Sequence, residues 1–184
     1  MGSTQALVPT TKGGKLMTRY PADLQKVIDF HGHLCPGVLI GYRASLIALR
    51  QLGTSRSVDE ELVATVYTGS CAADAVQVMT GCTFGKGNLI FRDLGKHVFL
   101  FSKRGESQSL RIALRYGVLD RDAAKTLLDM PDDMLYKIDR LEVGPPPPAR
   151  IYPIIQCSIC GEGVMEPRVR VKDGKLVCLE CAEN

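Results

Sequence analysis

Four cysteines near the C-terminus stand in two CxxC pairs, Cys157-Ser-Ile-Cys160 and Cys178-Leu-Glu-Cys181, which are separated by 17 residues. Four thiolates brought together by such pairs complete the closed tetrahedral shell of a structural zinc ion. Between the pairs, two stretches of alternating polarity, 168–172 and 175–178, flank Asp173-Gly174, a strong hairpin-turn signal. The hairpin would return the second pair to the first, so we expect a zinc site made of four cysteines. Redox-active or disulfide-forming pairs are the alternative.

A second constellation, His31-Gly-His33-Leu-Cys35-Pro-Gly, places two imidazoles and a thiol within five residues, directly before a predicted helix. Cys35 falls at or next to the helix N-cap, where free N–H groups and the helix dipole favour a thiolate. Cys71 has the same setting, with a strand before it and a helix after it. Asp74, three residues further on, is placed to bond back to the helix start.

Two histidines and two cysteines form a mixed nitrogen–sulfur ligand set that suits Zn, Fe, Ni or Cu. We therefore expect His31, His33, Cys35 and Cys71 to share a second transition metal. In this interpretation Cys71 is a metal-bound thiolate or nucleophile, and Asp74 orients a neighbour or accepts a proton. The alternative is that the cysteines are small buried hydrophobes and the histidines are polar caps. The distance between Cys71 and the histidine loop does not follow from the sequence.

Four other polar residues are weaker candidates for a functional site. Cys82 follows the C-terminus of a predicted helix, the wrong dipole end for a thiolate, so we expect it to pack in the core. His97 lies within a predicted strand and is expected to be structural. Lys86 in its glycine-rich loop binds an anion or is a solvated loop lysine. We expect Arg43 either to be partly buried against the His/Cys site or to be solvated, and partial burial is the favoured alternative.

The elements that must position these residues follow from periodicity and turn signals. We predict helices at 21–30, 36–52, 72–80, 122–130 and 132–141, and strands at 62–68, 88–92 and 97–102, with 109–116 either strand or helix. A tight turn, Asp93-Leu-Gly95, joins the last two strands. This order predicts an α+β core rather than a regular doubly wound sheet.

The 184 residues divide into a disordered leader (1–17), the α+β core (18–143), a proline-rich linker (144–153) and a small zinc-ribbon or treble-clef-like domain with four cysteine ligands (154–184). The linker contains four consecutive prolines, Pro145–Pro148, which cannot continue a helix. The last domain is too short to build a core alone, so the metal should supply its folding energy.

Composition narrows the classes of function. Apolar residues make up 45% of the chain and charged residues 23%, the balance of a globular protein. The net charge is only +3, and residues 153–184 carry four basic and five acidic side chains, so nucleic-acid binding is not expected. Residues 1–15 lack the apolar run of a signal peptide, and no stretch has the roughly 18 apolar residues of a membrane span, so we expect neither element. We expect a cytoplasmic protein with reduced thiols.

Three motifs resemble the FmdE family, named after a component of formylmethanofuran dehydrogenase: FHGHLCPGVLIGYRAS at 30–45, TGSCAADAVQVMTGCTFGKGNL at 68–89 and RDLGKHVF at 92–99. The resemblance covers about residues 20–184. It implies an α+β core, usually dimeric, with an optional zinc-binding C-terminal domain. It also implies a metal or active site at His33, Cys35 and Cys71, with His31 as a further candidate. The ribbon resembles a treble clef whose closing helix is short or absent.

Two functions are therefore predicted from different classes. The first is a metal-binding FmdE-like protein that uses the core His/Cys site as a metal-dependent enzyme, or as an accessory subunit linked to Mo/W-dependent oxidoreductases of the formylmethanofuran dehydrogenase type. The second is a noncatalytic zinc-ribbon regulator or adaptor, or a metal sensor or chaperone, that acts through protein contacts. We expect a homodimer, with an oxidoreductase or another protein as partner.

Overall fold

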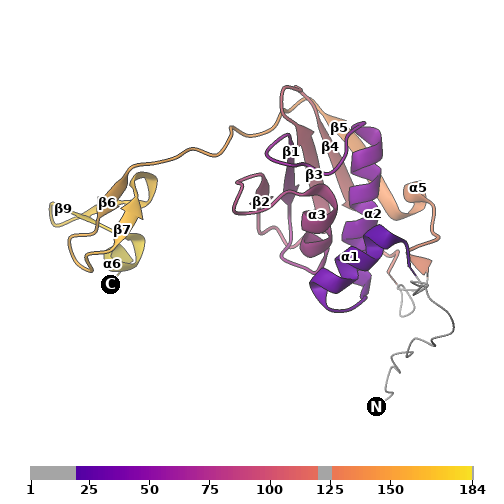
Figure 1. The fold of residues 1–184 in the computed structure, drawn as a ribbon, viewed down its shortest axis with the longest axis horizontal. Helices are drawn as coiled ribbons and strands as arrows, with labels where there is room; N and C mark the ends of the chain where they lie inside the picture. Colours follow the sequence, from indigo (N-terminus) through magenta and orange to yellow (C-terminus); the bar gives the residue numbers. More distant parts are fainter. Residues whose placement is uncertain (1–19, 120–125, 184) are drawn as a thin grey trace, which may run out of the picture. The chain divides into compact units, whose positions relative to one another are not determined.

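The structure, a computed structural model, describes residues 20–119 and 126–183 of the chain. It divides into two compact units that separate between Pro147 and Pro148, a position inside the predicted linker. The first unit is a mixed helix-and-sheet core, and the second contains the four C-terminal cysteines (Figure 1).

Five strands form the sheet of the core, in the order β2-β1-β3-β4-β5. They are β1 (Leu62–Val66), β2 (Leu89–Phe91), β3 (Val98–Lys103), β4 (Ser109–Leu114) and β5 (Tyr136–Leu141). β1 and β2 run parallel, and the other neighbours are antiparallel. The core is therefore α+β, as predicted. The stretch 109–116, for which the sequence allowed either a strand or a helix, contains the strand β4.

Three helices lie on one face of this sheet: α1 (Ala22–His31), α2 (Pro36–Gln51) and α3 (Ala72–Thr80) (Figure 1). α2 packs on β4, and α3 packs on β1. Their bounds agree with the predicted ones to within one residue. α2 begins with Pro36, whose fixed φ suits the first helical turn. Gly32, whose φ of +95° favours glycine, follows the last residue of α1 as its C-cap.

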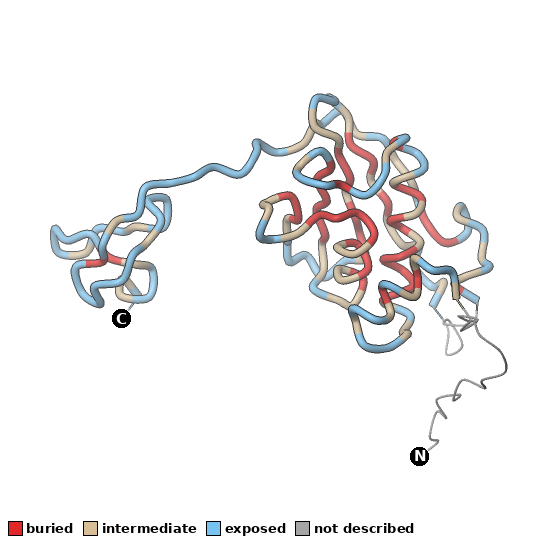
Figure 2. Tube along the Cα trace, viewed as in Figure 1, coloured by how far each residue is buried: buried red, intermediate tan, exposed pale blue. Residues whose placement is uncertain are grey.

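The core lies between the sheet and these helices, where the chain is most buried (Figure 2). Phe99 and Phe101 alternate along β3 toward the helices and are fully buried. Cys82 is fully buried as well, and its Sγ donates a hydrogen bond to the carbonyl of Leu62 at 3.2 Å. Its predicted role in packing is confirmed.

The predicted tight turn between the second and third strands is wrong. β2 and β3 do not pair with each other, because β1 lies between them. The connecting segment crosses the end of β1, where the amides of Leu94 and Lys96 both donate to the carbonyl of Tyr67. Pairing with β1 buries both strands more completely than a two-stranded hairpin would.

The predicted helix at 132–141 is wrong beyond its first turn. α5 covers only Asp132–Leu135, and the chain continues as β5. In β5 the apolar residues Tyr136 and Ile138 alternate with Lys137 and Asp139, a period of two that fits an edge strand on β4. Residues 122–125 of the predicted helix at 122–130 lie outside the described residues. Residues 127–130 form turns and a bend, so the prediction of a helix is wrong there.

The second unit consists of two small hairpins and a short helix. Its elements are β6 (Ile154–Gln156), β7 (Gly163–Met165), the 3-10 turn η1 (Glu166–Arg168), β8 (Arg170–Lys172), β9 (Lys175–Val177) and α6 (Leu179–Glu183). At the β8–β9 turn, Asp173 and Gly174 have φ of 51° and 73°, the left-handed pair of a type I′ hairpin turn. The predicted hairpin is confirmed. α6 spans only five residues.

The helices in the described parts of the chain are too short or too polar to cross a membrane.

Candidate metal centres

The four cysteines of the second unit form one cluster. Their Sγ atoms all lie within 4.8 Å of one another, and Cys160 Sγ is 4.0 Å from Cys178 Sγ. A tetrahedral zinc ion with Zn–S bonds of about 2.3 Å holds its sulfurs about 3.8 Å apart. The cluster therefore has the size and donor set of a zinc site with four thiolate ligands, as the CxxC spacing predicts.

Local backbone geometry shapes each pair of cysteines. Gly161, with φ of +79°, closes a turn in which its amide donates to the carbonyl of Cys157 at 3.0 Å. The amides of Cys178 and Cys181 donate to Cys157 Sγ and Cys178 Sγ at 3.3 and 3.4 Å. Such N–H···S contacts stabilise thiolates, which are the form that binds zinc.

The same cluster favours a bound cation electrostatically. Backbone amides of Cys160, Cys178 and Ile159 lower the pKa of Cys157 to about 6. By contrast, the neighbouring Cys178 raises the pKa of Cys181 to about 12. Four adjacent thiols cannot all ionise at neutral pH without a cation between them. With four protein ligands the shell is closed, which is typical of a structural zinc ion.

A second cluster lies in the core, where His31, Cys35 and Cys71 offer ligand atoms within 4.8 Å of one another. His31 Nε2 is 3.9 Å from Cys35 Sγ. All three residues are partly buried, and the His31 side chain is 13% exposed. The structure therefore brings Cys71 to the histidine loop from 36 positions further along the chain.

Three helix ends position this cluster. His31 is the last residue of α1, and Cys35 is the N-cap of α2, where its Sγ accepts a hydrogen bond from the amide of Val38 at 3.4 Å. Cys71 is the N-cap of α3. Both cysteines thus lie at the N-terminal ends of helices, and the side chain of Cys35 caps its helix.

Two glycines of α2 allow this convergence. A Cβ on Gly41 would lie 2.2 Å from the carbonyl oxygen of Ala72, and a Cβ on Gly37 would lie 3.0 Å from Cys71 Cβ. Because both positions lack a side chain, the start of α3 packs directly against the backbone of α2. Sequence reasoning missed these residues, although their spacing of four places them on one helix face.

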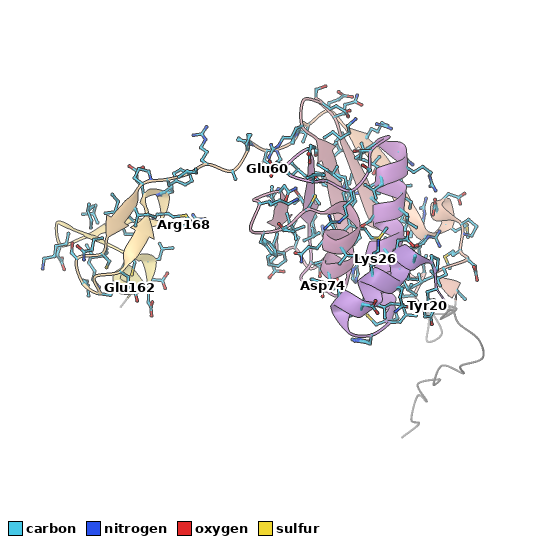
Figure 3. All side chains as sticks on the ribbon, in the orientation of Figure 1. Tyr20, Lys26, Glu60, Asp74, Glu162 and Arg168 are labelled. Carbon is cyan, nitrogen blue, oxygen red and sulfur yellow. The ribbon has the colours of Figure 1, made fainter. Side chains whose placement is uncertain are left out.

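Asp74 connects to the cluster through His31. Its Oδ2 lies 2.8 Å from His31 Nδ1, at the end of the core where α1 ends and α3 begins (Figure 3). The sequence predicts a bond from Asp74 back to the start of its own helix, but the hydrogen bond that it makes is with His31. A carboxylate on Nδ1 holds the proton there and leaves Nε2 free to bind a metal.

His33 lies beside the cluster rather than within it. Its ring centroid is 4.7 Å from that of His31, with the ring planes tilted by 40°, and the residue is exposed. The three converging ligand atoms come from His31, Cys35 and Cys71 without His33. The choice between His31 and His33 across Gly32 could not be resolved from sequence, because it depends on the residue at which α1 ends.

The residues present fit a transition metal. Burial raises the pKa of the Cys71 thiol, and the neighbouring Cys35 raises it further, so the two thiols do not readily ionise together without a cation. The hydroxyl of Ser70, adjacent to Cys71, is buried without a hydrogen-bond partner in the described chain. One nitrogen and two sulfur donors suit Zn, Fe, Ni or Cu, and three protein ligands leave a position for another group.

The remaining sequence candidates lie elsewhere. Arg43 donates to three backbone carbonyls between Leu127 and Met130 at 2.5–2.7 Å and to Asp132 at 2.6 Å, so it anchors the segment before β5. Lys86 Nζ donates to the carbonyls of Val58 and Asp59, so it ties two loops together.

Comparisons with known proteins match one family model to each of the two units of the chain. A sequence model described as FmdE, molybdenum formylmethanofuran dehydrogenase operon, matches residues 30–137. A second, for the prokaryotic dksA/traR C4-type zinc finger, matches residues 150–183.

Two relatives extend over most of the chain. A probable S-adenosyl-L-methionine-binding protein of Archaeoglobus fulgidus is 32% identical over 195 residues, covering 86% of this chain and 52% of the relative. The chain thus spans about half the length of this curated relative. The crystal structure of a tungsten formylmethanofuran dehydrogenase FmdE-like protein from Syntrophus aciditrophicus aligns with a TM-score of 0.65 and 21% identity, over 86% of this chain and 89% of that chain. That similarity shows a shared fold.

Proposed function

The chain belongs to the FmdE family and ends in a C4 zinc finger, and on this basis we propose that its core holds one transition metal at His31, Cys35 and Cys71. The observation that carries the proposal is the convergence of these three ligand atoms within 4.8 Å, with Asp74 hydrogen-bonded to the other nitrogen of His31. This is the carboxylate–histidine–metal arrangement that fixes the tautomer and the ring orientation of a metal-binding histidine.

We propose distinct roles for the residues around this site. Cys35 and Cys71, at the starts of α2 and α3, bind the metal as thiolates. Asp74 orients His31 and, being 44% exposed, can exchange a proton with solvent. A transition metal held by three protein ligands would supply Lewis-acid activation of a fourth ligand.

Family membership is the basis for a proposal about the cellular role of this site. We propose a metal-dependent enzyme or an accessory subunit that acts with a Mo/W-dependent oxidoreductase of the formylmethanofuran dehydrogenase type. Support comes from the description of the matching family, which names the operon of such an enzyme. A cytoplasmic homodimer with an oxidoreductase partner stays a prediction, which co-purification from a native host would test.

The zinc finger supports a second candidate function, as an adaptor. Ile154 and Met165 are cross-strand partners in β6 and β7, and they are 63% and 57% exposed. Val171 and Leu176, partners in β8 and β9, are 73% and 45% exposed. Exposed apolar pairs on a small domain are suited to contact a protein partner. The adaptor function predicts partner binding that survives loss of the core site.

Metal content of the full-length protein distinguishes these possibilities. We expect the wild type to hold one more metal ion per chain than a Cys71→Ser variant. A Cys82→Ser variant is the matched control, since Cys82 is a cysteine of the same domain outside both clusters, and it should retain the wild-type content. Equal metal content in the wild type and Cys71→Ser would refute the core site and leave the adaptor function.

A further inference from the structure

A cavity of about 610 Å³ lies against the sheet at the ends of β3 and β4, outside both cysteine clusters. Val98 and Ala113 form part of its base and are cross-strand partners. Their neighbours Phe99 and Ile112 point into the core beneath the helices, so Val98 and Ala113 project from the opposite face of the sheet. The volume is within the usual range for small-molecule sites, about 300–1,000 Å³.

The wall of this cavity is strongly basic. Lys96, Arg111 and Arg115 line it, and no carboxylate does among the described residues. Arg111 forms an ion pair with Asp139 at 3.6 Å, while Arg115 donates through Nε to the backbone carbonyl of Asp133. The cations that line the cavity therefore favour an anionic ligand.

A histidine in the same wall is left without a partner. His97 lines the cavity, and its Nδ1 is buried with no hydrogen bond to any described residue. Burial lowers the pKa of His97, which favours the neutral form of the ring. A buried polar atom without a partner is costly, which is a reason to expect that a ligand or a water hydrogen-bonds to it.

The rim adds an aromatic surface. Tyr116 lines the cavity with its side chain fully exposed, and Leu119, also in the lining, is 42% exposed. An exposed tyrosine beside an apolar base is suited to stack on a planar ring. Lys96 and His97 belong to the RDLGKHVF motif, which the metal site does not use.

We infer that this cavity binds a small anion that carries an aromatic ring. Lys96, Arg111 and Arg115 hold the phosphate or carboxylate group, and Tyr116 stacks on the ring. The apolar base formed by Val98 and its neighbours excludes water from that ring. The site does not depend on a metal in the core, because it shares no residue with the His31, Cys35 and Cys71 cluster.

Calorimetric titration of the full-length protein tests the inference with two probes, adenosine monophosphate and anthranilate. One carries a phosphate and the other a carboxylate, and comparing them shows which anion is preferred. We expect at least one to bind saturably at low salt. Its uncharged counterpart, adenosine or aniline, should bind about tenfold more weakly, because a hydrogen-bonded charge is lost.

Variants locate the binding. Lys96 is exposed, so Lys96→Ala should leave the fold intact and weaken binding of the preferred probe about tenfold. Lys26→Ala is the matched control, because Lys26 is an exposed lysine in α1 that does not line the cavity, and it should bind as the wild type does. Cys71→Ser should also bind normally, which separates this test from the metal proposal. The inference is overturned if neither probe binds, or if Lys96→Ala and Lys26→Ala bind equally.

Discussion

Alanine at position 41 should push α3 away from α2 and so disrupt the core cluster. The added Cβ would lie 2.2 Å from the carbonyl oxygen of Ala72, a distance that must open to at least 3.0 Å. Because the obstacle is backbone, it cannot rotate away as a side chain could. Ala72 directly follows Cys71. A shift of about 0.8 Å at Ala72 therefore moves this proposed ligand by several times the tolerance of metal–ligand distances, about 0.2 Å.

The energetic consequence of Gly41→Ala has two opposing parts. Overpacking a dense core costs about 1–3 kcal/mol, and a backbone clash belongs at the upper end. The higher helix propensity of alanine than of glycine offsets about 1 kcal/mol of this cost. The expected net loss of about 2 kcal/mol lowers the Tm by about 4–8 °C for a domain of this size. Metal affinity at the core should fall at least about tenfold.

Thermal melting and chelator competition on the full-length protein measure both effects. Gly37→Ala should be milder, since its Cβ would lie 3.0 Å from a Cys71 side-chain atom. Gly85→Ala is the control, because no atom lies within 4 Å of its added Cβ. If Gly41→Ala melts and binds metal like Gly85→Ala, the close contact between α2 and α3 does not position Cys71.

Three further perturbations test other parts of the account. Asp74→Asn should weaken core metal binding about 10–100-fold in chelator competition, whereas Asp29→Asn on the exposed side of α1 should not; equal affinities would remove Asp74 from the site. Burial raises the pKa of Asp132, but hydrogen bonds from Arg43 and Arg50 outweigh it and hold that pKa below its ordinary value. Its carboxylate therefore stabilises the fold at neutral pH, and this contribution disappears as pH falls through its folded pKa. Asp132→Asn should accordingly lower the free energy of unfolding by about 1–2 kcal/mol at pH 7. Urea melts should show a smaller difference between the variant and the wild type at about pH 3. An equal difference at the two pH values would contradict the ion pair. Chelation of the finger's zinc should make the β8–β9 amides exchange rapidly while those of β3 stay protected; protection at β8–β9 after chelation would show that the hairpin folds without metal.

Features that depend on neighbouring residues could be predicted from sequence. The CxxC pairs and the Asp173-Gly174 turn predict the four-cysteine cluster, because each signal acts within a few residues. The bounds of α1, α2 and α3 follow from prolines and glycines at their ends.

Features that depend on pairing between residues far apart in the chain could not be predicted from the sequence. The insertion of β1 between β2 and β3 is decided by burial of both strands, which no local turn signal reports. β5 follows a one-turn helix because Tyr136 and Ile138 find partners on β4. At the core site, Cys35 and Cys71 are identifiable by their helix-start setting, whereas the partnership of Asp74 with His31 crosses 43 residues. The choice of His31 over His33 depends on where α1 stops.

X-ray absorption of the core metal tests the central claim most directly. The measurement uses a full-length Cys157→Ser/Cys160→Ser variant loaded with cobalt, so that the finger no longer offers a complete set of sulfur ligands. The account predicts two sulfur ligands at about 2.3 Å and nitrogen or oxygen ligands at about 2.0–2.1 Å, with one sulfur lost in the additional Cys71→Ser variant. A shell without sulfur, or one unchanged by Cys71→Ser, would contradict it.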